Sequence, residues 1–155
     1  MKRQPDKKGK KKVIQVWSYP QAKKAFPYLM EVTRSLRDNY LEMRSAKHRG
    51  SRIENSGQHR SRHDFIILQE ANDAESRATD RYEQDVEELG ALGIFVVSPL
   101  EGLIAVPFVE EGQLAWFLVD LHADTPMKYW RFQSDPLEER RPITPKQKGA
   151  AWVSG

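Results

Sequence analysis

Three polar side chains that could do chemistry together, Asp120, His122 and Asp124, follow one another at steps of two. Residues two apart lie on the same face of a β-strand, so a strand through this segment would gather two carboxylates and an imidazole. Such a set suits a divalent metal ion or proton transfer, as in a metal-dependent enzyme. The alternative is the frayed end of a strand that enters the Thr125-Pro126 turn. We favour this alternative because no catalytic partner is identifiable elsewhere.

Two histidines, His59 and His63, are four residues apart, and His48 is near them in the sequence. On one face of a helix, His59 and His63 could chelate zinc or nickel. No Cys, Asp or Glu lies at ligand spacing to complete such a site. We therefore interpret the histidines as part of a basic loop that runs into the start of a helix, and we expect no metal and no cofactor.

The charged residues are segregated along the chain, although the formal net charge of the 155 residues is only +3. Residues 1–63 carry 17 basic and 5 acidic side chains, whereas residues 64–127 carry 2 basic and 14 acidic ones. Two stretches of the first block hold too little apolar surface to offset an ordering entropy of roughly 1–2 kcal/mol per residue. We predict a disordered basic arm at 1–12 and a mobile basic loop at about 45–63.

The arm and the loop together form a candidate nucleic-acid interface, because basic side chains held in a groove neutralise phosphates. The candidate residues are Lys7, Lys8, Lys10, Lys11, Lys12, Arg49, Arg52, Arg60 and Arg62. The arginine spacing at 49–52 and 60–63 is similar to that of arginine-rich nucleic-acid segments. However, no aromatic residue occurs between Met43 and Asp64 to stack on bases, and the acidic middle of the chain would repel a polyanion. We therefore rank nucleic-acid binding second.

Two long amphipathic helices are predicted over residues 19–45 and 64–90, where apolar residues recur at steps of three and four. Ser18 and Gln21 have the spacing of a capping box at the start of the first helix. Pro27 removes one backbone hydrogen bond and predicts a kink or a break just before it. The facing apolar stripes favour an antiparallel hairpin that is coiled-coil-like in part.

Strands follow the two helices, because the apolar pattern changes after Gly93. The four expected strands are Ile94–Val97, Leu103–Val109, Leu114–Leu121 and Met127–Phe132. Pro107 predicts an edge strand or a bulge, and the short links favour an antiparallel meander. The predicted fold class is therefore α+β, a helical hairpin packed on a three- or four-stranded antiparallel sheet. We assign residues 13–143 to this single domain and residues 144–155 to a flexible tail.

Several aromatic residues fall within the last two strands. They are Trp116, Phe117, Tyr129, Trp130 and Phe132. Such a set could line an apolar ligand pocket. We favour a place in the core between sheet and helices, where the large aromatic residues of a small domain belong.

The composition excludes several classes of protein. The absence of cysteine removes disulfides, thiolate metal sites, iron–sulfur clusters and cysteine nucleophiles. No apolar run exceeds seven residues, far short of the roughly 20 that a membrane helix needs. No apolar segment precedes Val13 to form the centre of a signal peptide. These features predict a soluble cytoplasmic protein with no membrane partner.

A series of short motifs runs through residues 13–143 in a recognisable order. The motifs are Val16-Trp17-Ser18-Tyr19-Pro20-Gln21-Ala22, Ala25-Phe26-Pro27, Leu89-Gly90, Leu92-Gly93, Gly102-Leu103-Ile104-Ala105-Val106-Pro107, Gly112, Tyr129-Trp130 and Arg140-Arg141-Pro142-Ile143. This order resembles that of a small bacterial family catalogued as domain of unknown function 2203. The resemblance implies the fold described above.

The chain departs from that family at its polar positions. The family pattern has an Asp where this chain has Ala105, and a His where it has Arg131. It also has a Cys-Trp pair and a Gly-Glu pair in the segment that here includes Val119, Asp120 and Asp124. If these positions form a site in the family, the resemblance implies that the site is lost or altered in this chain.

The function that we expect is a non-catalytic interaction, either with a protein partner or between copies of the chain. A helix pair longer than its sheet leaves apolar surface uncovered, and self-association through the hairpin is the simplest way to cover it. An auxiliary nucleic-acid-binding protein that uses the arm and the loop is the first alternative. A metal-dependent enzyme around Asp120, His122 and Asp124 is the second.

Overall fold

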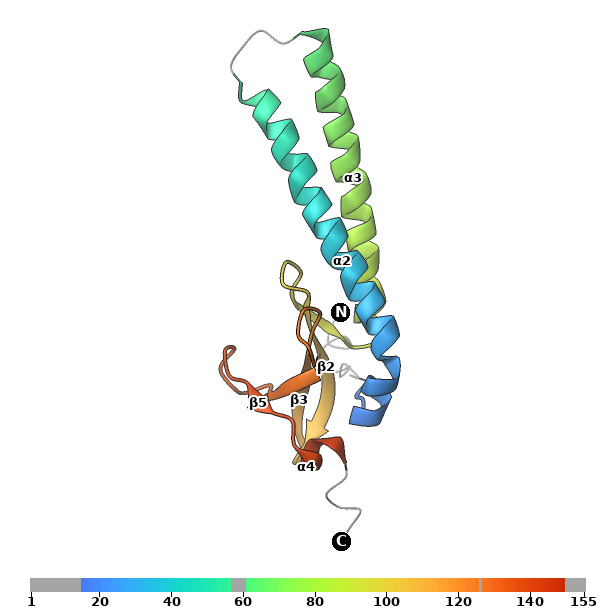
Figure 1. Cartoon of the computed structure of the whole chain (residues 1–155), viewed down its shortest axis with the longest axis vertical. Coiled ribbons are helices and arrows are strands. Elements are labelled where there is room, and N and C mark those ends of the chain that lie inside the picture. The colour runs from blue at the N-terminus through green and yellow to red at the C-terminus, as the bar shows by residue number, and fades with distance from the viewer. Residues whose placement is uncertain (1–14, 57–60, 126, 150–155) are drawn as a thin grey trace, which may run out of the picture.

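The computed structural model of the protein describes residues 15–56, 61–125 and 127–149. Two long helices are followed by five antiparallel strands and a short helix. The elements are α2 (Tyr19–Glu54), α3 (Arg62–Gly90), β1 (Phe95–Ser98), β2 (Leu103–Glu110), β3 (Gln113–Asp120), β4 (Met127–Phe132), β5 (Arg141–Pro142) and α4 (Pro145–Lys148). The hairpin of α2 and α3 stands far out from the sheet, as Figure 1 shows. The predicted α+β class with a helical hairpin is therefore confirmed.

Helix α2 begins with the predicted capping box. The Ser18 hydroxyl accepts a hydrogen bond from the Gln21 backbone N–H at 3.2 Å, and the Gln21 side chain accepts one from the Ser18 N–H at 2.9 Å. The predicted break at Pro27 is absent, because the helix continues through this residue. Ala22 and Leu29 are fully buried on either side of Pro27, so packing offsets the hydrogen bond that the proline cannot make.

Helix α2 is also longer than the sequence predicted, because residues 45–54 are helical rather than part of a loop. Gly50, a residue of low helix propensity, lies buried inside this helix. A Cβ atom built on Gly50 would lie 3.6 Å from Leu68 Cδ1 and 3.8 Å from the Ala71 Cβ of α3. Ala46 is also buried. These small residues let the two helices approach closely, and tertiary packing thereby overrides the weak helix propensity of this segment.

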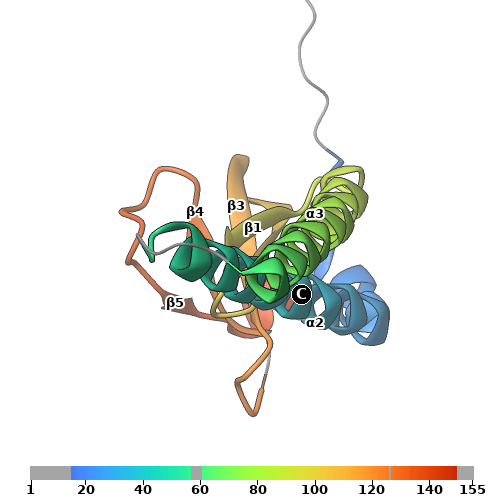
Figure 2. The ribbon, with the colours of Figure 1, turned by 90° about the horizontal axis from the view of Figure 1, so that it is seen from above.

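Helix α3 begins at a second capping box. Ser61 and Asp64 exchange hydrogen bonds between side chain and backbone at 3.1 and 3.2 Å. Ala71 and Ala78 are buried along this helix, and so is Leu89 at its base. The two helices run side by side in front of the sheet when the molecule is viewed from the tip of the hairpin (Figure 2).

The sheet has the simple order β1-β2-β3-β4-β5, so neighbouring strands in the chain are neighbours in space. Glu111 and Gly112 both have positive φ, at 54° and 74°, as expected for the two central residues of a tight hairpin turn. Pro107 lies beyond the short strand β1, and its carbonyl accepts a hydrogen bond from the Trp17 backbone N–H at 2.8 Å. The predicted edge strand or bulge at Pro107 is therefore wrong, because β2 lies between β1 and β3 and its register with β3 is regular. The proline is tolerated because β1 pairs only with residues 103–105 of this strand.

The principal core lies between the base of the hairpin and one face of the sheet, here called the inner face. Its buried members include Leu29, Leu36, Ile104, Phe117 and Trp130. Phe108 stacks on Phe117, with ring centroids 3.8 Å apart. This core anchors the lower half of the hairpin and leaves the upper half free of the sheet.

Two short elements at the end of the chain were not predicted. Strand β5 pairs with β4 through Tyr129–Pro142 and Trp130–Arg141, and α4 contacts the turn between β2 and β3. In that contact the Gln147 amide donates a hydrogen bond to Glu110 at 3.1 Å, and Lys146 lies 3.5 Å from the same carboxylate. A two-residue strand and a four-residue helix are too short to produce a periodic pattern.

No helix in the described part of the chain is both long enough and apolar enough to cross a membrane.

Candidate functional site

The base of the hairpin is held by polar contacts between α2 and α3. Asp85 accepts hydrogen bonds from Ser35 Oγ at 2.8 Å and from Asn39 Nδ2 at 3.2 Å. The Tyr28 hydroxyl donates a hydrogen bond to the carboxylate of Glu88. This bond, with smaller contributions from burial and the nearby charge, raises the pKa of Tyr28 to about 12. These contacts fix the register of the two helices and use neutral donors rather than arginine or lysine.

The tip of the hairpin exposes apolar side chains. Phe65 is 56% exposed and Ile66 is 48% exposed. A shallow hollow beside them is lined by Arg49, Arg52, Ile53, Ser56, Asp64 and Ile67. The uncovered apolar surface expected along the hairpin is therefore concentrated at its tip, because the stripe between the helices is buried.

Opposite charges lie on exposed surfaces of the two long helices. Arg44, Lys47 and His48 project within little more than one turn of α2, and we call them the basic ridge. Asp80, Glu83 and Glu87 recur at steps of three and four on α3, and we call them the acidic stripe. All six side chains are exposed. Among the described residues, no ion pair within 4.0 Å joins a basic side chain of α2 to an acidic side chain of α3.

The predicted nucleic-acid residues are only partly within the described structure. Lys7, Lys8, Lys10, Lys11, Lys12 and Arg60 lie outside it. Arg49 and Arg52 are on the last turns of α2, and Arg62 is the first residue of α3. Arg49 is 3.7 Å from Glu42 of its own helix. The structure therefore gathers three of the nine candidates near the tip of the hairpin.

The residues proposed for a metal site do not form one face of a strand, because β3 ends at Asp120. The Asp120 carboxylate instead accepts a hydrogen bond from the His122 backbone N–H at 2.9 Å, which closes a local turn. His122 and Asp124 are exposed. The favoured alternative, a strand end that enters a turn, describes this segment correctly.

The histidine pair is also only partly described, since His59 lies outside the described residues and His63 is exposed in the first turn of α3. Within residues 15–56, 61–125 and 127–149, no three His, Asp or Glu side chains are grouped so that they could hold a metal ion.

The face of the sheet turned away from the hairpin, here called the outer face, is unusually apolar. The strand register places Phe95 beside Ala105, Ala105 beside Leu118, and Trp116 beside Arg131 on this face. A solvated sheet face normally alternates with polar residues. The lack of polar residues between Leu103 and Val109 was a sequence signal that this strand is covered, at least in part, on both sides.

A hollow of about 480 Å³, here called the sheet hollow, lies on the outer face. Strands β1 to β4 form its floor, and the connection from β4 to β5 forms one wall. Its lining residues are Phe95, Val97, Ala105, Trp116, Leu118, Arg131, Gln133, Leu137 and Arg140. The only charged side chains in this described lining are the two arginines.

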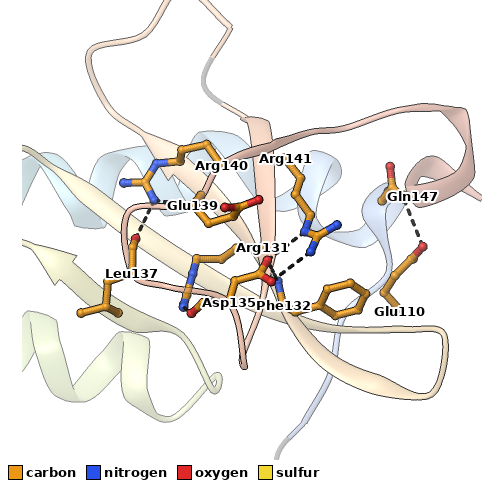
Figure 3. Close-up of polar contacts among 9 residues, drawn as sticks. All are labelled: Glu110, Arg131, Phe132, Asp135, Leu137, Glu139, Arg140, Arg141 and Gln147. Atoms are coloured by element: carbon orange, nitrogen blue, oxygen red, sulfur yellow. Dashed lines mark hydrogen bonds and ion pairs between the residues drawn. The ribbon is translucent and has the colours of Figure 1, made fainter.

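The wall of the sheet hollow is positioned by an ion pair that the sequence analysis missed. Arg141 donates hydrogen bonds to both carboxylate oxygens of Asp135, at 2.8 and 3.0 Å. The hydrogen bond from Arg141 lowers the pKa of Asp135 to about 2, and the Phe132 backbone N–H, at 2.9 Å from the carboxylate, adds to this effect. Figure 3 shows Arg141 and Asp135 at the centre of the connection, with Arg140 and Leu137 on one side of them.

The aromatic residues of β3 and β4 divide between the two faces. Phe117 and Trp130 are buried in the principal core, and Phe132 packs against it, as predicted. Trp116 instead lines the sheet hollow, and its indole N–H donates a hydrogen bond to Gln133 Oε1 at 2.5 Å. Tyr129 lies on the same outer face. The division follows from the alternation of side chains along a strand.

A comparison with protein families gives one match that covers most of the chain. The family model described as "Uncharacterized conserved protein (DUF2203)" matches residues 15–143, which include both long helices and all five strands. The chain belongs to the DUF2203 family. The resemblance predicted from the motifs is thereby confirmed. No curated protein and no solved structure matches the chain.

Two of the positions at which the motifs predict a departure from the family pattern lie close together. Ala105 and Arg131 both line the sheet hollow. Val119 is buried on the inner face instead, and Asp120 lies in a neighbouring hollow that also contains Glu101 and Lys128. The altered positions therefore do not converge on one cluster, but the outer face of the sheet contains three of them.

Proposed function

We propose that this protein is a non-catalytic interaction protein that self-associates through its helical hairpin, with two copies packed antiparallel. The observation that carries the proposal is the pair of exposed surfaces of opposite charge, the basic ridge on α2 and the acidic stripe on α3. Both are exposed, and neither takes part in an ion pair among the described residues. A second copy of the chain supplies the complementary charge for each.

The order of charges along the hairpin favours the antiparallel arrangement. The basic ridge lies beside Glu75 of its own α3, and the acidic stripe begins at Asp80, nearer the base. When one hairpin is turned end for end against another, each ridge comes level with the stripe of the other copy. A two-fold axis makes every such contact twice, so the surface is self-complementary.

The strength expected of this dimer is modest. Exposed ion pairs contribute only about 0.2–1 kcal/mol each, and added salt screens them. Helix α2 has 36 residues and is therefore about 54 Å long, which gives two hairpins a long contact. Phe65 and Ile66 at the tip add apolar surface that such packing covers. We expect a dimer that weakens strongly as the ionic strength rises.

A charge-reversal experiment tests this proposal by sedimentation velocity at low and high salt. Arg44→Glu with Lys47→Glu reverses the ridge, and Glu83→Lys with Glu87→Lys reverses the stripe. Each double variant alone should weaken association by at least about tenfold. An equimolar mixture of the two should form a heterodimer, because each reversed surface then meets its complement.

The matched control is Lys23→Glu with Lys24→Glu, which makes the same charge change on exposed residues at the other end of α2. This variant should associate as the unmodified chain does. A monomer at low salt, or failure of the two reversed variants to pair, would contradict the proposal. Binding to RNA at about 150 mM salt that is lost in the ridge variant would instead favour the nucleic-acid alternative.

A further inference from the structure

The sheet hollow combines an apolar floor with positive charge at one end. Phe95 is 60% exposed and Val97 is 43% exposed on its rim, while Ala105 and Leu118 are buried at its base. Its volume of about 480 Å³ lies within the range of roughly 300–1,000 Å³ that is usual for small-molecule sites. The hollow therefore has the size and the apolar character of a ligand site.

Arg131 lines this hollow and has a buried donor without a partner. Its Nη2 donates a hydrogen bond to the backbone carbonyl of Asp135, which holds the guanidinium against the wall. Its Nε atom is buried and has no hydrogen-bond partner. A buried donor that lacks a partner is unfavourable, so an acceptor that reached this nitrogen would stabilise the fold.

Arg140 supplies a second charge. Among the described residues it makes no ion pair within 4.0 Å, although it also lines the neighbouring hollow that contains Asp120 and Glu101. Its guanidinium donates hydrogen bonds only to the backbone carbonyls of Leu137 and Glu139, at 3.1 and 3.3 Å, among the described contacts. Asp135, the carboxylate at the centre of the connection, is already bound by Arg141 on both oxygens. Figure 3 shows Arg140 and Arg131 near Leu137, on the side away from Gln147.

We propose that the sheet hollow binds a small organic carboxylate whose apolar body lies on Phe95, Trp116 and Leu118 and whose carboxylate meets Arg131 and Arg140. A guanidinium matches a carboxylate with paired N–H donors, and the apolar floor selects a ligand that is not charged along its length. Leu137 is 80% exposed beside the hollow, so a ligand there would also cover this side chain.

Three probes distinguish the contribution of the apolar floor from that of the two arginines. Octanoate has both an apolar chain and a carboxylate, 1-octanol has only the chain, and inorganic phosphate has only the charge. Binding is followed by NMR through the indole N–H signal of Trp116, which is assigned with Trp116→Phe. Octanoate should shift this signal at millimolar concentration, and it should bind at least about fivefold more tightly than 1-octanol. Phosphate should leave the signal unchanged.

Substitutions of the two arginines then test their roles. Arg131→Gln and Arg140→Gln should each weaken octanoate binding about fivefold or more and leave 1-octanol binding nearly unchanged. Arg34→Gln removes the same charge from an exposed position on α2 and should have no effect. Because Arg131 also holds the connection in place, Arg140→Gln provides an independent test should Arg131→Gln alter the fold.

Three results would overturn the proposal. The first is an unmoved Trp116 signal at high octanoate concentration. The second is equal affinity for octanoate and 1-octanol, or no loss in either arginine variant. The third is a chain that does not bind octanoate and forms a dimer that Phe95→Asp converts to a monomer. In that case a second copy of the chain, and not a small carboxylate, would cover this face.

Discussion

The guanidinium of Arg141 binds both carboxylate oxygens of Asp135 and also lies over the rings of Trp130 and Phe132, 5.3 and 4.8 Å from their centroids. One side chain thus ties the β4–β5 connection to the edge of the principal core. Strand β5 has only two residues, so its backbone pairing alone provides little to hold the connection. The position of Arg140 beside the sheet hollow depends on this tie.

The Asp135–Arg141 pair should make stability depend on pH in the acid range. Because Arg141 lowers the pKa of Asp135 to about 2, the carboxylate stabilises the fold above its usual pKa near 4, and this contribution is lost as the pH falls toward 2. The unmodified chain should have a higher urea midpoint than Asp135→Asn at pH 7, and the difference should shrink between about pH 4 and pH 2.

Glu138→Gln is the control for this measurement, because Glu138 is exposed in the same connection. Its urea midpoint should follow that of the unmodified chain at every pH. A difference between Asp135→Asn and the unmodified chain that stays constant down to pH 2 would contradict the ion pair.

Tyr28 should titrate at unusually high pH. Its hydrogen bond to Glu88 raises its pKa to about 12, and the neutral phenol is therefore favoured in the folded chain. The stability that it contributes is present below pH 10 and decreases as the pH rises from about 10 toward 12. Ultraviolet titration of the phenolate, as a difference from Tyr28→Phe, should detect this shift. In Glu88→Gln the midpoint should return toward 10, whereas Glu87→Gln should leave it unchanged.

Gly50 gives opposite predictions for a small and a large substituent. An added Cβ would lie 3.4 Å from Asn72 Oδ1, with its other nearest atoms farther away, so Gly50→Ala fits and should stabilise the chain by up to about 1 kcal/mol through helix propensity. Gly50→Leu should destabilise it by about 1–3 kcal/mol, because the larger side chain must displace Leu68 or Ala71.

Thermal unfolding and hydrogen exchange of residues 45–54 measure this difference. Ser45→Leu, on an exposed side of the same helix, should change stability by less than about 0.5 kcal/mol. If both Gly50 substitutions were neutral, residues 45–54 would not form the helix that packs on α3.

The capping box at the start of α3 should contribute to the stability of the chain, although both of its residues lie at the surface. Ser61 satisfies the Asp64 N–H, and Ser61→Ala should cost about 0.5–2 kcal/mol at the tip of the hairpin. Hydrogen exchange should accelerate in the first turns of α3 and not at its base. Ser76→Ala, on the exposed middle of the helix, serves as the comparison, and equal effects of the two changes would argue against the cap.

Local sequence determined where the long helices and most of the strands form. The two capping boxes begin their helices because a side chain three residues away is the nearest available partner. The apolar period of three to four in the helices and the short runs after Gly93 likewise determined which element forms where. The charge segregation and the family membership are also properties of the sequence alone.

Tertiary structure decided the features that depend on distant partners. Gly50 is part of a helix because Leu68 and Ala71 of α3 pack against it, and no window of sequence around Gly50 contains them. Asp120 and His122 share a turn instead of a strand face because β3 ends there. Arg131 and Arg140 are brought to one hollow by a two-residue strand and by the ion pair of Asp135 with Arg141. Such contacts leave no periodic pattern in the sequence. They form between residues that are distant in the chain and that the packing of the core brings together.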